Sequence, residues 1–366
     1  MDFGRLSILK GYYGSFTKFM KIAIRVDANE IVATGHLVRD IAIANQLRKF
    51  NAEVLFILAE AKQLDRLEQN KFPYRILHSD WRRLDEELPA LKKLIAEEHV
   101  DLIMVDSYSA SNFYLADLNG ILPVIYIDDL SKEIYDIAMV IHYIPNIDET
   151  EYKLRYRNAS PGTRVYTGLK YCPLRDEFNN LRYRKIQSRP LNILLTTGGT
   201  DPLNLEFKIL NKILSSSELG NFTVDVIIGD LSTHFEELDE LRRKDTARVR
   251  LHQHVVHMSS FMRNSRIAVS ACGTTLYELC ACGLPSVAFA IADNQLKVGE
   301  YMDRLQLINY CGDARNCKIE DFVIEQVEKL AGNEELLTRI SSCIVGAVDG
   351  DGAERVAKKI IALYDR

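Results

Sequence analysis

The chain has 366 residues, with 46 Lys and Arg against 51 Asp and Glu, a formal net charge of −5 and a pI of about 6.0. This length corresponds to about two domains. The acidic balance argues against a nucleic-acid-binding protein, which needs a basic face to neutralise phosphates. The hydrophobic fraction of 47% and the charged fraction of 27% exclude a disordered or fibrous chain. No apolar run reaches the roughly 18 residues that a membrane span requires.

The cysteines and the first residues bear on the location of the protein. The seven cysteines include no Cys-x-x-Cys pair, so they are typical of reduced thiols in the cytoplasm rather than of a zinc ribbon or a redox motif. The first 20 residues are basic and aromatic, but glycines interrupt them, and a signal peptide is not indicated. We expect residues 1–20 to form an N-terminal extension and the first domain to begin at Lys21.

After this extension, short apolar runs alternate with segments of helical period. Strands alternating with helices build a parallel sheet from βαβ units. The predicted strands of the first half are Lys21–Val26, Glu53–Leu58, Tyr74–His78, Asp101–Asp106, Pro123–Asp128 and Ala138–His142, and the predicted helices include Leu37–Phe50 and Asp85–His99.

The same alternation restarts at about Asn192. The predicted strands there are Asn192–Thr197, Thr223–Ile228, Val249–His252, Ile267–Ala271 and Ser286–Ala290. The predicted helices are Leu203–Leu214, Thr274–Cys282, Asn294–Leu305, Ile319–Leu330 and Ala353–Tyr364. We expect the last of these helices to cross back to the first domain.

The predicted fold class is therefore α/β, with two doubly wound Rossmann-type domains that face each other across a cleft. We place the first domain at 21–173, a linker rich in Arg, Asn and Lys at 174–190, and the second domain at 191–366. In open α/β sheets ligands bind outside the carboxyl ends of the strands, so the cleft is the expected binding site.

The first polar cluster follows the strand that ends at Asp27. A helix begins near Gly35, which puts His36 at the helix N-terminus, where the macrodipole disfavours an imidazolium ion. A neutral imidazole can take a proton from water as a general base. Gly35 lets a ligand approach the backbone, and the free N–H groups of the first turn suit an anion. The alternative is a histidine that only caps its helix.

Two further clusters lie at strand–helix junctions of the second half. The turn Gly198-Gly199-Thr200 has the shape expected for close phosphate contact, although such turns also serve packing alone. The turn Gly273-Thr274-Thr275 can hold a diphosphate. Glu278, one turn later, is either a solvated residue or an acceptor for ribose hydroxyls. Asn294 and Gln295 open the next helix.

Short motifs in a fixed order extend over nearly all of the chain after residue 20. They are Arg25-x-Asp27, Gly35-His36-x-x-Arg39, Asp106-Ser107-Tyr108, Tyr126-Ile127-Asp128-Asp129, Pro145-Asn146, Gly168-x-x-Tyr171-x-Pro173-Leu174-Arg175-x-Glu177-Phe178, Gly198-Gly199-Thr200-Asp201, Glu278 and Asn294-Gln295. This series resembles the PseG/SpsG family, and the stretch 273–295 resembles the donor site of MurG-type GT-B glycosyltransferases. Members of the PseG/SpsG family are GT-B-fold hydrolases of UDP-linked diacetamido-trideoxy sugars and related spore-coat polysaccharide proteins.

The resemblance implies a UDP-sugar as the substrate and His36 as the catalytic residue. His36 would activate a water that attacks the anomeric carbon, and UDP would leave with inversion. The residues implied on the sugar side are Asp27, Gly35, Arg39 and Tyr108, although Tyr108 could instead be an aromatic residue of the rim. The residues implied in nucleotide binding are Gly198, Gly199, Thr200, Gly273, Thr274, Thr275, Glu278, Asn294 and Gln295. The scheme requires no metal and no other cofactor.

Three functional hypotheses follow. The first is a cytoplasmic hydrolase of a UDP-linked acetamido-deoxy sugar, in the synthesis of a nonulosonic acid like pseudaminic acid or of a surface polysaccharide. The second is a UDP-sugar-dependent glycosyltransferase with the same donor site, for which the basic, aromatic residues 1–20 are the hint of a lipid acceptor. The third is a non-catalytic nucleotide-sugar-binding partner, in which His36 can be replaced without loss of function. The sequence carries no signal for the identity of the sugar or for the oligomeric state.

Overall fold

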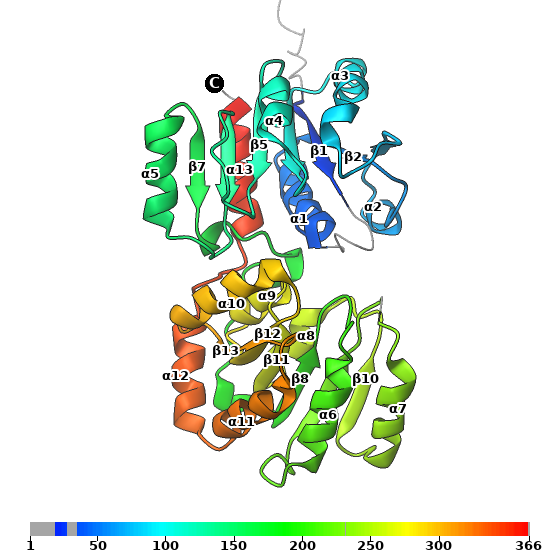
Figure 1. Ribbon diagram of the computed structural model, residues 1–366, viewed down its shortest axis with the longest axis vertical. Coiled ribbons are helices and arrows are strands. Elements are labelled where there is room, and N and C mark those ends of the chain that lie inside the picture. The colour runs from blue at the N-terminus through cyan, green and yellow to red at the C-terminus, as the bar shows by residue number, and fades with distance from the viewer. Residues whose placement is uncertain (1–18, 28–34, 231, 365–366) are drawn as a thin grey trace, which may run out of the picture.

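The computed structural model describes residues 19–27, 35–230 and 232–364. These residues form two parallel sheets, one of seven strands and one of six, with helices on both faces (Figure 1). The predicted fold class is confirmed. Most of the predicted N-terminal extension, residues 1–18, lies outside the described residues. Within those described ranges, no helix is long and apolar enough to cross a membrane.

The first sheet has the strand order β3-β2-β1-β4-β5-β6-β7, and all its pairs are parallel. The order reverses direction beside β1, which has β2 on one side and β4 on the other. This switch point opens a crevice at the carboxyl ends of β1 and β4. The strands are β1 Lys21–Val26, β2 Glu53–Leu58, β3 Tyr74–Ile76, β4 Leu102–Asp106, β5 Val124–Ile127, β6 Met139–His142 and β7 Arg164–Thr167, and the helices are α1 Gly35–Lys49, α2 Asp65–Gln69, α3 Leu88–Glu97, α4 Asn112–Asn119 and α5 Glu149–Ala159.

The second sheet repeats this plan with the order β10-β9-β8-β11-β12-β13 and a switch point between β8 and β11. Its strands are β8 Asn192–Thr196, β9 Thr223–Ile227, β10 Val249–His252, β11 Ile267–Ala271, β12 Ser286–Ala290 and β13 Asn309–Asp313. Its helices are α6 Leu205–Ser215, α7 Phe235–Lys244, α8 Met258–Arg263, α9 Thr275–Ala281, α10 Asp293–Arg304, α11 Ile319–Ala331 and α12 Glu334–Ile344. The carboxyl ends of both sheets face the junction between the two halves (Figure 1).

Central strands were predictable because they are buried on both faces. All five residues of β4, β8 and β11 are buried, as expected for apolar runs inside a parallel sheet. The edge strands β7 and β13 were not predicted, because their short sequences RVYT and NYCGD are only partly buried and carry no apolar run. The predicted helix 85–99 is in fact a 3₁₀ turn, Leu84–Glu87, followed by α3, which has a proline at its start.

The segment 174–190, predicted as a linker, is anchored to the rest of the protein by a few buried side chains. Leu174, Phe178 and Ile186 are buried within a hydrophobic cluster that includes residues of both halves. Arg189 is 2% exposed and donates to the carbonyls of Met262, Ser265 and Cys282, among others. Burial lowers the pKa of Arg189 to about 10. The chain then returns: α13, Gly352–Tyr364, packs against α1 in the first half.

The return of the chain depends on Gly350. This residue has a φ of +85°, and a Cβ built on it would lie 2.0 Å from the carbonyl oxygen of Phe178. We expect Gly350→Ala to lower the free energy of unfolding by about 2–4 kcal/mol. Alanine is strained at a positive φ, and its Cβ would clash with the backbone of Phe178. Urea denaturation measures this difference.

The matched control is Gly162→Ala, where a Cβ would meet nothing within 4 Å. Its free energy of unfolding is expected to stay within about 0.5 kcal/mol of wild type. Equal denaturation midpoints for the two variants would contradict the placement of the returning chain.

Candidate active site

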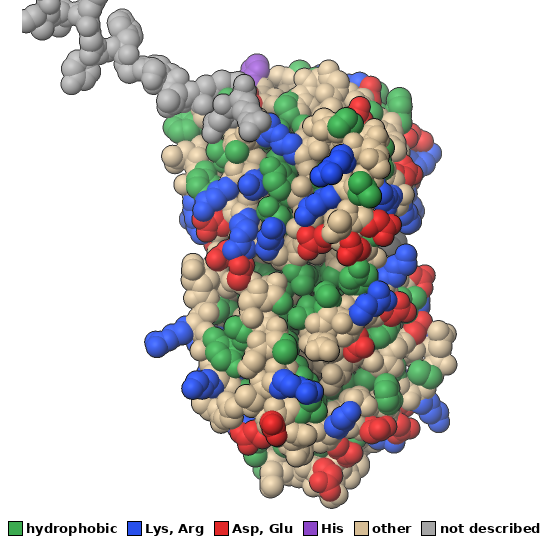
Figure 2. Space-filling model, turned by 90° about the vertical axis from the view of Figure 1, so that its left-hand side faces the viewer, with side chains coloured by type: hydrophobic (Ala, Val, Ile, Leu, Met, Phe, Trp, Pro, Cys, Tyr) green, Lys and Arg blue, Asp and Glu red, His purple; other side chains and the backbone are tan. Residues whose placement is uncertain are grey.

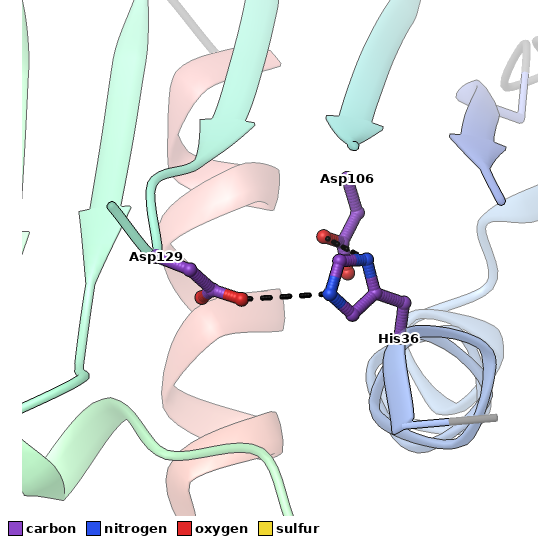
Figure 3. Close-up of side chains that lie close together, drawn as sticks. All are labelled: His36, Asp106 and Asp129. Atoms are coloured by element: carbon purple, nitrogen blue, oxygen red, sulfur yellow. Dashed lines mark ion pairs between the residues drawn. The ribbon is translucent and has the colours of Figure 1, made fainter. Parts of the chain in front are cut away.

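His36 lies in the first turn of α1, at the carboxyl edge of the first sheet, and is 4% exposed. Its Nδ1 is 3.1 Å from Oδ1 of Asp106, and its Nε2 is 3.6 Å from Oδ2 of Asp129 (Figure 3). Asp106 ends β4 and Asp129 follows β5, so neighbouring elements of the sheet hold one imidazole between two carboxylates. The helix N-terminus repels positive charge on the ring, whereas the carboxylates stabilise it once the ring takes a proton.

Arg39, three residues after His36, joins these two carboxylates. Its Nε donates to Oδ2 of Asp106 at 2.6 Å, its Nη2 donates to the other oxygen of Asp106, and its Nη1 donates to Oδ1 of Asp129 at 2.9 Å. Nη1 also donates to the hydroxyl of Tyr143 at 2.6 Å. Burial acts to lower the pKa of Arg39, but Asp106 and Asp129 raise it well above its usual range. The guanidinium therefore positions the carboxylates. The sequence analysis expected Arg39 on the sugar side, but its hydrogen bonds go to these buried partners.

Asp106 stays ionised despite its burial. Burial raises the pKa of this carboxyl, but the charges of Arg39 and His36 act against burial and bring the pKa below its usual value. An ionised Asp106 beside Nδ1 can hold the Nδ1 proton and stabilise the imidazolium that forms when Nε2 takes a proton.

The same groups could also be considered as a metal site. Ligand atoms of His36, Asp106 and Asp129 all lie within 4.8 Å of one another. However, Arg39 already donates to both carboxylates, and a dication bound there would be repelled by the guanidinium at close range. The donor set therefore fits an arginine–carboxylate network rather than a metal site.

Tyr108 connects this cluster to the second half. Its ring packs edge-on against the imidazole of His36, with 4.5 Å between centroids and an interplanar angle of 76°. Its hydroxyl hydrogen-bonds with the side chain of Asn294 in α10. Tyr108 is 38% exposed, so it stands at the junction between His36 and the second half rather than in the core.

Asp27, expected on the sugar side, is part of the scaffold beneath the site. It is 3% exposed, and its two oxygens accept hydrogen bonds from Arg25 at 2.6 Å and from the hydroxyl of Ser107 at 2.6 Å. The fully buried Arg25 also donates to Glu87 at 2.7 Å and 3.0 Å. This network fixes the ends of β1 and β4 relative to each other.

The predicted phosphate turns leave open space beside their backbones. A Cβ built on Gly198, Gly199 or Gly273 would meet nothing within 4 Å. Gly35 abuts this region, because its Cβ would lie 3.5 Å from Cγ2 of Thr274. The N-terminus of α1, with His36, and the turn before α9 therefore meet at the junction of the two halves.

Gly229, which the sequence analysis missed, supports the turn at Gly198 and Gly199. A Cβ on Gly229 would lie 2.2 Å from the carbonyl oxygen of Gly198 and 2.5 Å from atoms of Gly199. Only glycine allows this approach. The signal that could have found it is a glycine at the end of the apolar run that includes β9 and Ile228.

The remaining nucleotide-site candidates differ in their partners. Glu278 is 9% exposed, and its Oε1 accepts two hydrogen bonds from Arg175, at 3.0 Å and 2.8 Å. Burial raises the pKa of Glu278, and Arg175 only partly opposes this. Oε1 of Gln295 accepts from the N–H of Ile291 at 2.9 Å, so this side chain stabilises the start of α10. Thr275 is the first residue of α9. The backbone carbonyl of Thr200 accepts a hydrogen bond from the hydroxyl of Thr197 at 2.9 Å.

Glu206 lies fully buried at the base of the 198–200 turn. Its Oε1 accepts from the N–H and the hydroxyl of Thr197, at 2.9 Å and 2.8 Å. Burial raises the pKa of Glu206 to about 7, from an ordinary value of 4.5, and the charge of Asp201 acts in the same direction. The folded protein therefore binds this proton more tightly than the unfolded chain, so its stabilising contribution is complete below pH 4.5 and is lost as the pH rises to about 7.

Glu206→Gln should remove this dependence. We expect the free energy of unfolding of the variant, relative to wild type, to rise by about 3 kcal/mol between pH 4.5 and pH 8. Chemical denaturation at both pH values measures it. The exposed Glu240→Gln is the control and should show no such change. A difference between Glu206→Gln and wild type that is the same at both pH values would mean that Glu206 does not hold the proton.

Comparisons with known proteins give distant relatives. No family model matches the chain. An uncharacterized protein of Methanocaldococcus jannaschii is 26% identical over 300 residues, which are 79% of this chain and 59% of that protein. The spore coat polysaccharide biosynthesis protein SpsG of Bacillus subtilis is 24% identical over 56% of this chain and 60% of its own length. A UDP-2,4-diacetamido-2,4,6-trideoxy-beta-L-altropyranose hydrolase of Campylobacter jejuni is 23% identical over 53% of this chain and 66% of its own length.

The chain thus spans only about three-fifths of the first two of these relatives, 59% and 60%. Several solved structures, by contrast, superpose on nearly the whole length of this chain. MurG of Acinetobacter baumannii has a TM-score of 0.67 at 14% identity, covering 94% of this chain and 99% of MurG. LpCGTa in complex with UDP has a TM-score of 0.68 at 11% identity, covering 95% of this chain and 100% of that one. Anabaena HepE in complex with UDP-glucose has a TM-score of 0.56 at 13% identity, covering 94% and 99%. The chain therefore has the GT-B fold.

Proposed function

We propose that this protein hydrolyses a UDP-linked acetamido-deoxy sugar to UDP and the free sugar, in nonulosonic-acid or surface-polysaccharide synthesis. The observation that carries the proposal is His36, held between Asp106 and Asp129 directly beside the turn before α9. The names of the Bacillus and Campylobacter relatives support this substrate class. The proposal places the protein in the cytoplasm, where its seven free cysteines stay reduced.

In the proposed mechanism, Nε2 of His36 takes a proton from a water molecule. The water oxygen bonds to the anomeric carbon as the bond from that carbon to the diphosphate oxygen breaks, and the bonding electrons leave with UDP. Attack opposite the leaving group inverts the anomeric configuration. The Nδ1 proton stays on His36 and faces the carboxylate of Asp106, which together with Asp129 stabilises the imidazolium; Nε2 then releases its proton to solvent. Tyr108, whose ring packs edge-on against the imidazole, would orient the sugar or the water.

The second half would bind the nucleotide. The open backbone at Gly198, Gly199 and Gly273 leaves room for the diphosphate, and exposed Thr274 lies beside it. Helix N-termini stabilise the negative charge that grows on the leaving UDP. Glu278 would accept from the ribose hydroxyls. The other residues that we propose in nucleotide binding are Thr200, Thr275, Asn294 and Gln295.

We propose 21–173 and 191–366 as the bounds of the two domains, with the last helix of the second domain crossing back to the first.

The proposal predicts UDP release without an acceptor. Purified protein is offered a panel of UDP-amino sugars in plain buffer, and UDP and free sugar are quantified. Wild type should turn over at least one of them, and His36→Ala should reduce kcat by about 100-fold or more while UDP still binds, because only the proton acceptor is lost. His99→Asn, an exposed histidine after α3, is the control with unchanged turnover.

Each other outcome counts against a part of this proposal. UDP binding without turnover of any sugar would favour a transferase that lacks its acceptor. Turnover that survives His36→Ala would refute the catalytic role of His36. Tight nucleotide-sugar binding, with no turnover in the presence of any acceptor, would favour a binding partner without catalysis.

A separate prediction concerns Glu278 and the ribose. We expect Glu278→Gln to weaken UDP binding by about tenfold, because a charge-assisted hydrogen bond becomes a neutral one. The 2′-deoxy analogue of UDP should lose less, since it lacks one of the hydroxyls. Calorimetric titration of both ligands against both proteins measures this coupling. An equal loss for the two ligands would show that Glu278 acts on Arg175 and not on the 2′-hydroxyl.

A glycosyltransferase is the second candidate, and one surface favours it. Figure 2 shows several Lys and Arg side chains over the first half, on the face that carries α5, with Asp and Glu side chains among them. Leu154 is 51% exposed there, next to the exposed Lys153 and Arg157, a combination that suits a lipid acceptor at an anionic membrane. Lys153 is paired with Glu149 at 3.5 Å, which weakens this attraction.

A further inference from the structure

Asp40 is a buried acid that neither the sequence motifs nor the proposed mechanism uses. It lies on α1 four residues after His36, on the same side of the helix, and its exposure is 0%. No N–H or O–H donor from the described part of the chain satisfies either of its carboxyl oxygens. The carboxyl next to it is that of Asp106, the residue that flanks Nδ1 of His36, and the two can hydrogen-bond if one of them is protonated.

A contact between two carboxyls is stable only if a proton lies between them. Two ionised carboxylates repel, and an ionised carboxylate with no donor in the interior costs several kcal/mol. Arg39 does not supply a donor to Asp40, because its hydrogen bonds go to Asp106, Asp129 and Tyr143. Asp106 therefore carries the negative charge, and Asp40 carries the proton.

We propose that Asp40 is a positioning residue that stays protonated through the reaction and donates its hydrogen bond to Asp106, fixing that carboxylate against His36. The effect of Asp40 on turnover rests on the proposed function, whereas its protonation does not. The protonated state itself follows from burial and from the lack of donors. No proton moves from Asp40 in the catalytic step.

The charges around Asp40 support this arrangement. The groups that face it are Asp106 from β4, Asp129 from the loop after β5, and Arg39 and His36 from its own helix. With Asp40 neutral, the guanidinium and the two carboxylates sum to one negative charge, whereas an ionised Asp40 would raise this to two negative charges in a buried site. Burial and the neighbouring Asp106 raise the pKa of Asp40 well above its usual range, in agreement with this count.

Infrared spectroscopy tests the protonation directly, in the full chain and without substrate. The difference spectrum between wild type and Asp40→Asn at pH 7 should contain the carbonyl band of a protonated carboxylic acid, shifted in heavy water and unchanged from pH 5 to pH 8. Absence of this band would overturn the proposal even if the enzyme is active. Its presence would stand even if the protein hydrolyses no UDP-sugar.

Kinetics test the positioning role. Asparagine keeps a neutral donor, so Asp40→Asn should retain turnover within about threefold and the same pH profile, whereas Asp40→Leu should lower kcat by about tenfold or more with little change in KM. Circular dichroism and the UDP affinity establish that Asp40→Leu is folded. If it does not fold, the pH profile of Asp40→Asn decides. Equal losses for both variants, or a displaced pH profile in Asp40→Asn, would refute the role.

Discussion

The bonds of Arg39 to Asp106 and Asp129 are the constraint on which the site depends. They place the carboxylates that end two neighbouring strands on one guanidinium, and the imidazole of His36 fits between those carboxylates. Two buried anions would not remain so close without this cation, because their desolvation and repulsion would exceed any gain from packing. The switch point beside β1 makes the arrangement possible, since it brings the helix after β1 over the ends of β4 and β5.

The two halves meet through side chains as well as through the backbone. Tyr108 reaches Asn294, Arg175 bonds to Glu278, and the rings of Tyr143 and Tyr277 pack edge-on with centroids 5.9 Å apart. Tyr108, expected at the sugar, is thereby next to Asn294, expected at the nucleotide.

Much of the fold was predictable from sequence, but less of the site was. Central strands can be predicted from their unbroken apolar runs. The start of α1 at Gly35 can be predicted because a helix is expected after β1. The partial burial of β7 and β13 removes that signal. The location of His36 at the start of a helix could be predicted, and its catalytic role, implied by the family resemblance, stays a prediction. Its partners could not be predicted, because Asp106 and Asp129 are distant in sequence and only the strand order brings them together. For the same reason Arg39 and Asp27 resembled free sugar ligands, although the structure engages both with buried partners.

The return of the chain to the first half has a consequence for synthesis. The 13 residues of α13 bury Val356, Ala357 and Ile360 in the same hydrophobic cluster as α1, and they follow the whole second half in the sequence. The helix that carries His36 therefore stays partly uncovered until the second half has been synthesised. The first half cannot complete its core as an independent nascent domain, and the protein is exposed to premature association for the whole time that its second half is being made.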